Sequence, residues 1–269
     1  MKTRIRIRTI ITMLSFASSL MIKAQDPLFN SYPSAQAVIF LDFDGHTVNG
    51  TSWNYNGPIV CGTSGLDNSQ ITEIFNRVAE DYRPFNINVT TDSTKYLAAP
   101  ANKRMRVILT VSSSWYGSAG GVAFVNSFTW GDNNPCFVFS QLLNYNVKFI
   151  SEATSHETGH TLGLYHQASY DTSCVKLSDY HAGQGSGEIG WAPIMGVGYY
   201  QNFTLWNNGP NTYGCTSYQN DLDIITSATN GIGFRPDDHA NTFSDASVAS
   251  FYNNQFNLSG VVERNTDQD

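Results

Sequence analysis

The sequence has 269 residues, with 15 Lys and Arg, 22 Asp and Glu, and a formal net charge of −7. Because the ten basic residues that follow residue 24 are scattered through an acidic chain, we expect no nucleic-acid partner. No stretch beyond the N-terminal region offers about 18 consecutive apolar residues, so we expect no membrane anchor.

Residues 1–24 have the features of a secretory signal peptide. Ala24 suits the cleavage site, and the apolar run 9–22 follows the basic residues Lys2, Arg4, Arg6 and Arg8. Cleavage after Ala24 would leave 245 residues with ten basic and 22 acidic side chains, a net charge of −12. We therefore expect a secreted protein, extracellular or periplasmic. Its acidity favours solubility and makes Ca²⁺ a candidate cofactor.

Hydrophobic patterning predicts strands and helices up to about residue 162. The apolar run 37–43 predicts a buried strand, and residues 50–69 predict a loop. In residues 69–82 the apolar side chains recur with helical spacing, at Ile71, Ile74, Phe75, Val78 and Tyr82. Further strands are expected at 86–91, 105–111, 120–128 and 137–139, and a helix over about 146–162. After an irregular segment, a short helix is expected to begin at Asp221.

Residues 156–166 read His-Glu-Thr-Gly-His-Thr-Leu-Gly-Leu-Tyr-His and contain three of the six His residues. Because residues four apart lie on the same helix face, His156 and His160 can bind one metal ion. Gly163 can end the helix in a left-handed turn that brings His166 to the same ion. Glu157 lies one position round, where it can act as a general base beside the metal. Such a ligand set, with one open position, is typical of catalytic Zn²⁺ sites.

The pattern H-E-x-x-H-x-x-G-x-x-H resembles the signature of the metzincin clan of zinc metalloproteases, in which a Met-containing turn follows. Residues 192–196 (Ala-Pro-Ile-Met-Gly) match such a turn, and the resemblance implies that Met195 lies beneath the three imidazoles. The last four residues of the motif, 163–166 (Gly-Leu-Tyr-His), are similar to those of pappalysin-like enzymes. Gln167, however, differs from the residue found there in the best-known metzincin families. The whole chain is similar to a group of secreted bacterial metzincins.

The resemblance implies an α+β fold with a twisted five-stranded mixed sheet, a backing helix and an active-site helix. This upper subdomain would end at about residue 163, and an irregular lower subdomain would occupy 164–239. The fourth strand would be an antiparallel edge that binds an extended substrate, or a plain hairpin edge, at Gly121, Val122, Ala123 and Phe124. Tyr199 and Tyr200 follow the Met-turn. They are candidates for stabilising the transition state, with ordinary packing as the alternative.

Four cysteines in an exported chain suggest disulfides, and none of them has the C-x-x-C spacing of a metal site. Three pairings are possible, and we expect Cys174 to pair with Cys215 and Cys61 with Cys136. The first pair would join the loop after the zinc motif to the loop after the Met-turn.

Residues 240–269 differ in composition from the rest. A polar stretch at 241–250 predicts a linker, and residues 257–263 predict an opening β-strand. This segment resembles the start of the small β-sandwich that often follows secreted bacterial proteases.

These features predict a secreted zinc-dependent endopeptidase that acts on a protein or peptide substrate, with its catalytic domain at 25–239. We expect a monomer. Two alternatives stay open: a zinc-stabilised adhesin or binding module without turnover, and a zinc amidase acting on cell-wall peptide. The presence of Glu157 favours an enzyme, because a purely structural zinc site needs no base.

Overall fold

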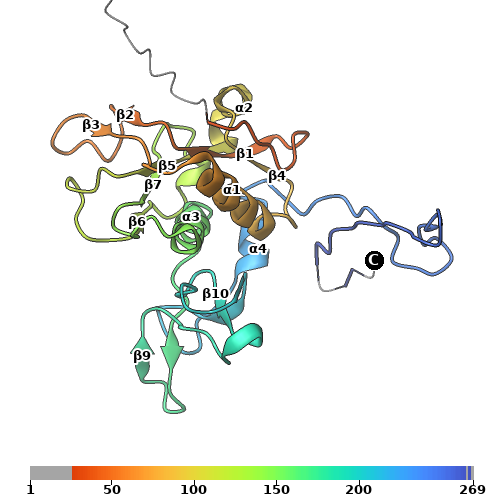
Figure 1. The fold of residues 1–269 in the computed structure, drawn as a ribbon. Helices are drawn as coiled ribbons and strands as arrows, with labels where there is room; N and C mark the ends of the chain where they lie inside the picture. The colour runs from red at the N-terminus through yellow and green to blue at the C-terminus, as the bar shows by residue number, and fades with distance from the viewer. Residues whose placement is uncertain (1–25, 265, 268–269) are drawn as a thin grey trace, which may run out of the picture.

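A mixed sheet of five strands lies in the upper part of the molecule (Figure 1). The computed structural model describes residues 26–264 and 266–267, so the predicted signal peptide at 1–24 lies outside the described residues. The strand order is β4 (Ile87–Thr90), β1 (Ala37–Asp42), β5 (Arg104–Thr110), β7 (Cys136–Phe139) and β6 (Gly121–Val122). Strands β4, β1, β5 and β7 are parallel, and β6 is an antiparallel edge strand. The predicted α+β class with a five-stranded mixed sheet is confirmed.

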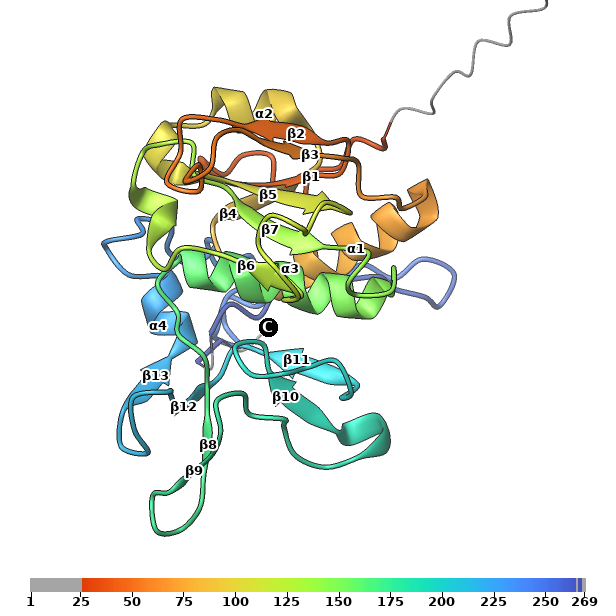
Figure 2. The same cartoon turned by 90° about the vertical axis from the view of Figure 1, so that its left-hand side faces the viewer.

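Helices α1 (Asn68–Asp81) and α3 (Val147–Thr161) pack against each other on one face of the sheet (Figure 2). Their apolar residues form the main core with inward-facing strand residues such as Ile39 and Val107. The opposite face is covered by α2 (Ser93–Ala98) and by the hairpin of β2 (His46–Val48) and β3 (Ile59–Cys61). Strand β1 is buried along its whole length, as expected for a central parallel strand with both faces covered.

Helix α1 follows the predicted spacing to within one residue at each end. It begins with a capping box, in which Asp67 accepts the N–H of Gln70 and the Gln70 side chain accepts the N–H of Asp67. Its apolar stripe is buried, at Ile71, Ile74, Phe75 and Val78. Pro84 follows the helix and cannot continue it.

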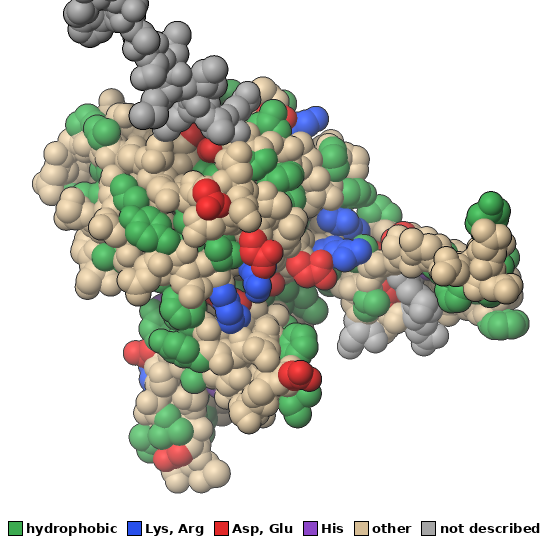
Figure 3. Space-filling view, viewed as in Figure 1, with side chains coloured by type: hydrophobic (Ala, Val, Ile, Leu, Met, Phe, Trp, Pro, Cys, Tyr) green, Lys and Arg blue, Asp and Glu red, His purple; other side chains and the backbone are tan. Residues whose placement is uncertain are grey.

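Below α3, the chain forms a lower part made of short paired strands (Figures 1 and 2). These pairs are β8 (Ser169–Tyr170) with β9 (Lys176–Ser178), β10 (Trp191–Pro193) with β11 (Phe203–Leu205), and β12 (Asn208–Pro210) with β13 (Tyr218–Asn220). Helix α4 (Asp221–Ile225) begins at the predicted residue. The space-filling view shows this lower part as a narrower body, with the C-terminal segment extending to one side (Figure 3).

The described C-terminal segment, 240–264 and 266–267, contains a single isolated bridge, between Tyr252 and Gln255. Arg83 donates to the carbonyl of Gly260 at 3.4 Å and ties this segment to the end of α1. The strand predicted at 257–263 is not formed, because these residues have no strand neighbour to pair with in the described structure. The expected β-sandwich domain stays a prediction. Within the part of the chain that the structure describes, no helix is long and apolar enough to cross a membrane.

Three further stretches differ from the sequence-based expectation. The predicted loop 50–69 contains β3, and α2 was not expected, because elements of three to six residues are too short to show periodicity. The predicted strand 120–128 is ordered as a strand only at Gly121–Val122. Asn126 has a left-handed φ of 65° and turns the chain into a 3₁₀ helix at Ser127–Thr129. Two further 3₁₀ helices lie at Ala101–Lys103 and Gly187–Ile189.

The cysteine prediction is half confirmed. Cys174 and Cys215 form a disulfide with a Cα–Cα distance of 5.4 Å. The predicted pair of Cys61 and Cys136 is wrong, because both are buried free thiols. Successive residues of a strand face opposite sides of the sheet, and Cys136 in β7 faces the helices while Cys61 packs on the other face beside Phe137. The sheet therefore separates the two sulfurs.

Candidate metal centre

Helix α3 is buried between the sheet and the lower part, and its sequence suits that position. Asn146 caps its start by accepting the N–H of Phe149 at 3.1 Å. Its buried hydroxyl groups donate to carbonyls of the preceding turn, as Thr154 does to Ile150 and Thr158 to Thr154, each at 2.7 Å. These bonds satisfy polar groups that would otherwise be costly to bury.

The helix ends where the motif predicts. Leu162 is the C-cap, and Gly163 follows with a left-handed φ of 102°. A Cβ at Gly163 would lie 2.5 Å from Oδ1 of Asn126, so a larger residue would be strained and crowded there. The turn redirects the chain towards α3 and brings His166 back to the helix.

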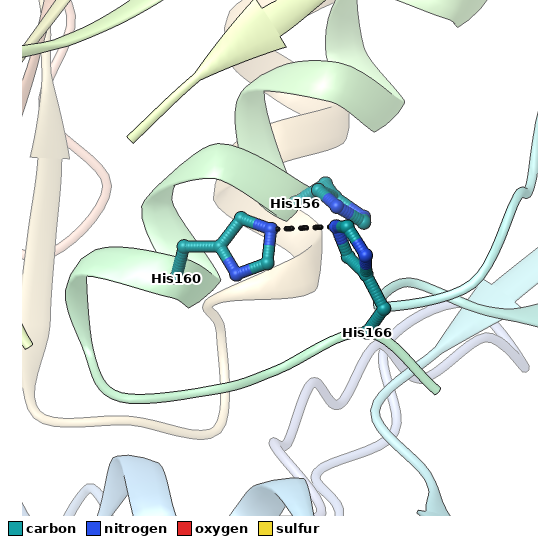
Figure 4. Close-up of side chains that lie close together, drawn as sticks. All are labelled: His156, His160 and His166. Atoms are coloured by element: carbon teal, nitrogen blue, oxygen red, sulfur yellow. Dashed lines mark hydrogen bonds between the residues drawn. The ribbon is translucent and has the colours of Figure 1, made fainter. Parts of the chain in front are cut away.

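His156 and His160 extend from α3, and His166 faces them from the segment that follows (Figure 4). The potential ligand atoms of the three residues all lie within 4.8 Å of one another. The Nε2 atoms of His160 and His166 are 3.0 Å apart. Two nitrogens on one tetrahedral Zn²⁺ would lie roughly 3.3 Å apart, so the three imidazoles fit such an ion.

Backbone carbonyls orient two of these imidazoles. Nδ1 of His156 lies 2.8 Å from the carbonyl oxygen of Ile194, and Nδ1 of His160 lies 2.7 Å from that of Leu164. Because a carbonyl oxygen only accepts, each Nδ1 carries the proton, and each Nε2 keeps its lone pair for a metal.

Burial keeps all three imidazoles neutral. It lowers the pKa of His156 well below the ordinary value and also lowers that of His160. The pKa of His166 falls to about 4, because of burial first and of His160 second. Neutral imidazoles are the form that binds a metal, so the site is ready for one at neutral pH.

Glu157 lies beside the triad but outside the group of converging ligand atoms. Its side chain is 8% exposed and contacts the edge strand at Gly121. Burial raises the pKa of Glu157 to about 8. A cation bound by the imidazoles would favour the ionised form, in which the carboxylate can accept a proton.

Met195 is completely buried against the same helix. A Cβ at Gly159 would lie 2.6 Å from the Met195 sulfur, so the sulfur packs on the helix between the two ligating positions. The carbonyl of Met195 accepts the N–H of Gln167 at 2.8 Å. The segment that contains Met195 is thus tied both to His156, through Ile194, and to the residue that follows His166.

Gln167 has a structural role that the sequence did not reveal. It is 1% exposed, and its Nε2 donates to the Asn207 carbonyl at 2.9 Å and to Oδ1 of Asp221 at 3.1 Å. Its Oε1 accepts from Nδ2 of Asn207 at 2.6 Å. Its Nε2 also donates to the carbonyl of Gln219 in β13 at 3.3 Å. Gln167 therefore connects the end of the motif with the residue before β12, with β13 and with the start of α4, and this explains why an amide is accommodated here.

The tyrosines around the site have different positions. Tyr199 lines a cavity beside His156 and Glu157, and burial raises its pKa to about 12, so its hydroxyl stays protonated and can donate. Tyr200 is 82% exposed, contacts Phe149 and does not line this cavity. Tyr180 was not predicted, yet its ring centroid lies 4.2 Å from that of His166. It comes from an irregular loop, where no local pattern indicates proximity to the metal site.

Of the residues expected in the substrate-binding edge, Gly121 and Val122 form β6 and pair with Val138 and Phe137 of β7. Ala123 and Phe124 continue beyond the strand, and the Phe124 ring stacks on Trp53 at 3.9 Å. The outer edge of β6 has no strand neighbour among the described residues.

A second group of possible ligands lies far from the triad in sequence. Carboxylate oxygens of Asp237, Glu263 and Asp267 lie within 4.8 Å of one another. Such acidic groups are common on protein surfaces, and the expectation of Ca²⁺ stays a prediction.

Comparison with protein-family models gave no match, and neither did a search of curated proteins. The functional interpretation therefore rests on the residues and geometry described above.

Proposed function

We propose that the protein is a secreted zinc-dependent endopeptidase of the metzincin type. The observation that carries the proposal is the convergence of His156, His160 and His166, with Glu157 buried beside them and outside the ligand set. The Cys174–Cys215 disulfide supports export, because disulfides persist mainly outside the cytosol.

His156, His160 and His166 would hold the metal. A bound Zn²⁺ would polarise the scissile carbonyl and acidify an attacking water. Glu157 would accept the proton of that water and pass it to the leaving amine. The free edge of β6 can pair with an extended peptide by strand addition, which would align the scissile bond along the site.

Zinc content and hydrolysis in the Glu157→Gln variant test this proposal. Gln keeps the size of the side chain but cannot act as a base, so bound zinc and melting temperature should stay near wild type. The rate of hydrolysis of an unfolded protein substrate should fall by about 10²–10⁴. Loss of zinc would make Glu157 a ligand, and unchanged hydrolysis would exclude the proposed mechanism.

Assays of the zinc-loaded wild type separate the two alternative functions. Release of peptide fragments from peptidoglycan, without cleavage of an unfolded protein, would indicate an amidase. A zinc-loaded wild type that hydrolyses neither substrate would indicate a binding module.

A further inference from the structure

A cavity of about 450 Å³ opens beside the metal centre. Helix α3 forms one wall with Glu152, His156 and Glu157, and residues 194 and 196–199 form another. Residues 119–121, which include the start of β6, also line it. A peptide cleaved at the triad would therefore place the side chain next to its scissile bond at the mouth of this cavity.

Glu152 is the acidic residue of this cavity that the proposed reaction does not use. It precedes His156 by one helical turn and so lies on the same face of α3. The side chain is 8% exposed. Its Oε1 accepts from Nζ of Lys148 at 2.8 Å and from Oγ1 of Thr204 at 3.1 Å.

The second carboxylate oxygen is different. Oε2 of Glu152 is buried and has no hydrogen-bond partner among the described residues. A charged oxygen without a donor is costly to bury, so this position favours a ligand that brings an N–H group.

Gly198 lies beside that oxygen and brings no side chain over it. A Cβ at position 198 would lie 2.7 Å from Oε2 of Glu152 and 3.3 Å from its carboxyl carbon. The backbone of the cavity wall therefore passes directly beside the carboxylate, and any side chain at 198 would crowd it.

We propose that Glu152 makes the enzyme select substrates with a Lys or Arg side chain next to the cleaved bond. The inference rests on the proposed peptidase function and names its substrate class. The ammonium or guanidinium group would donate to Oε2 in a charge-assisted hydrogen bond. Lys148 and Thr204 hold Oε1, so they fix the carboxylate and leave Oε2 for the substrate.

Cleavage-site profiling of the zinc-loaded wild type, on a mixture of unfolded proteins, gives the first test and needs no variant. Lys and Arg should be enriched at one position flanking the cleaved bond. Absence of enrichment at both flanking positions would overturn the inference and leave the peptidase function intact. Absence of all cleavage would overturn both.

A pair of peptides that differ only in Lys against norleucine at that position gives the second test. Glu152→Gln should reduce the ratio of their kcat/KM values by roughly 10- to 100-fold, as expected for the loss of a hydrogen bond to a charged group. Gly198→Ala should lower the same ratio by crowding Oε2. Glu73→Gln removes an acidic partner from an exposed ion pair on α1 and should leave the ratio unchanged. An unchanged ratio in Glu152→Gln would overturn the inference and show that Glu152 has only a structural role, linking α3 to β11 through Thr204.

Discussion

The backbone of Gly121 lies directly against the side chain of Glu157. A Cβ at position 121 would come within 2.6 Å of Cγ and 2.8 Å of Oε1 of Glu157. The edge strand proposed to bind substrate therefore also sets the position of the proposed base. A peptide added to the free edge of β6 would lie one strand away from that carboxylate.

Gly121→Ala should therefore reduce activity without removing the metal. The added methyl group must displace Glu157 or the edge strand, and overpacking of this kind typically costs about 1–3 kcal/mol. When the catalytic geometry bears this cost, kcat/KM should fall by roughly 5- to 150-fold, with zinc content unchanged.

Gly214→Ala is the matched control, because no atom lies within 4 Å of its added Cβ and its φ is ordinary. Wild-type activity in Gly121→Ala would show that Glu157 is not held by this contact.

His160→Ala tests the ligand assignment by stability. A metal that binds only the folded state raises the melting temperature, so a chelator should lower that of the wild type. The variant should bind less zinc and should show a much smaller response to chelator.

His46→Ala serves as its control, since His46 lies in the hairpin on the other face of the sheet and contacts Arg106. A chelator response in His160→Ala as large as in the wild type would exclude His160 as a ligand.

The disulfide in the lower part should contribute strongly to stability. Cys174 and Cys215 are separated by 41 residues. In the chain-entropy model, closing such a loop is worth about 3–4 kcal/mol. Replacing both by Ser should lower the free energy of unfolding by an amount of this order, measured by urea denaturation.

Thiol titration checks the pairing independently. The unfolded, unreduced protein should show two free thiols, Cys61 and Cys136. The folded protein should react slowly, because burial raises the pKa of Cys61 to about 12 and that of Cys136 well above its ordinary value. Four reactive thiols, or none, after unfolding would contradict the structure.

Local signals made part of this fold and site predictable. The spacing of Ile71, Ile74, Phe75 and Val78 is a property of one helix, and it predicts α1 to within one residue at each end. The motif is equally local, because two ligands share a helix face and Gly163 supplies the turn to the third. In each case the determinant and the structure lie within about four turns of chain.

The remaining features depend on contacts between distant segments. Tyr180 reaches His166, and Gln167 binds Asn207 and Asp221, through loops that have no periodicity. The even number of cysteines suggests a bond between Cys61 and Cys136. The sheet that separates these two residues depends on strand register, which the number of cysteines does not reveal. The unpaired oxygen of Glu152 is visible only once Gly198 and Thr204 are folded against α3.

Asp81 should make the stability of the protein depend on pH. It lies at the end of α1, where its Oδ2 accepts from Oγ of Ser155 on α3 at 2.5 Å. Burial raises its pKa from 3.8 to about 8, and the hydrogen bond from Ser155 only partly offsets this. Between pH 3.8 and about 8, Asp81 is therefore protonated in the folded state and ionised in the unfolded state.

Because the folded state holds the extra proton, this contribution to stability is complete below pH 4 and is lost as the pH rises towards 8. Between pH 5 and 7 the loss should be roughly 2–3 kcal/mol for a single group. Asp81→Asn keeps the shape and remains neutral, so this loss should be absent in the variant. Urea unfolding at pH 5, 6 and 7 gives the free energy of unfolding of both proteins in their metal-free form. The difference between wild type and variant should change with pH by this amount, because the titration of the histidines is common to both and cancels. Parallel stability curves for the two proteins would show that Asp81 is ionised in the folded state at neutral pH.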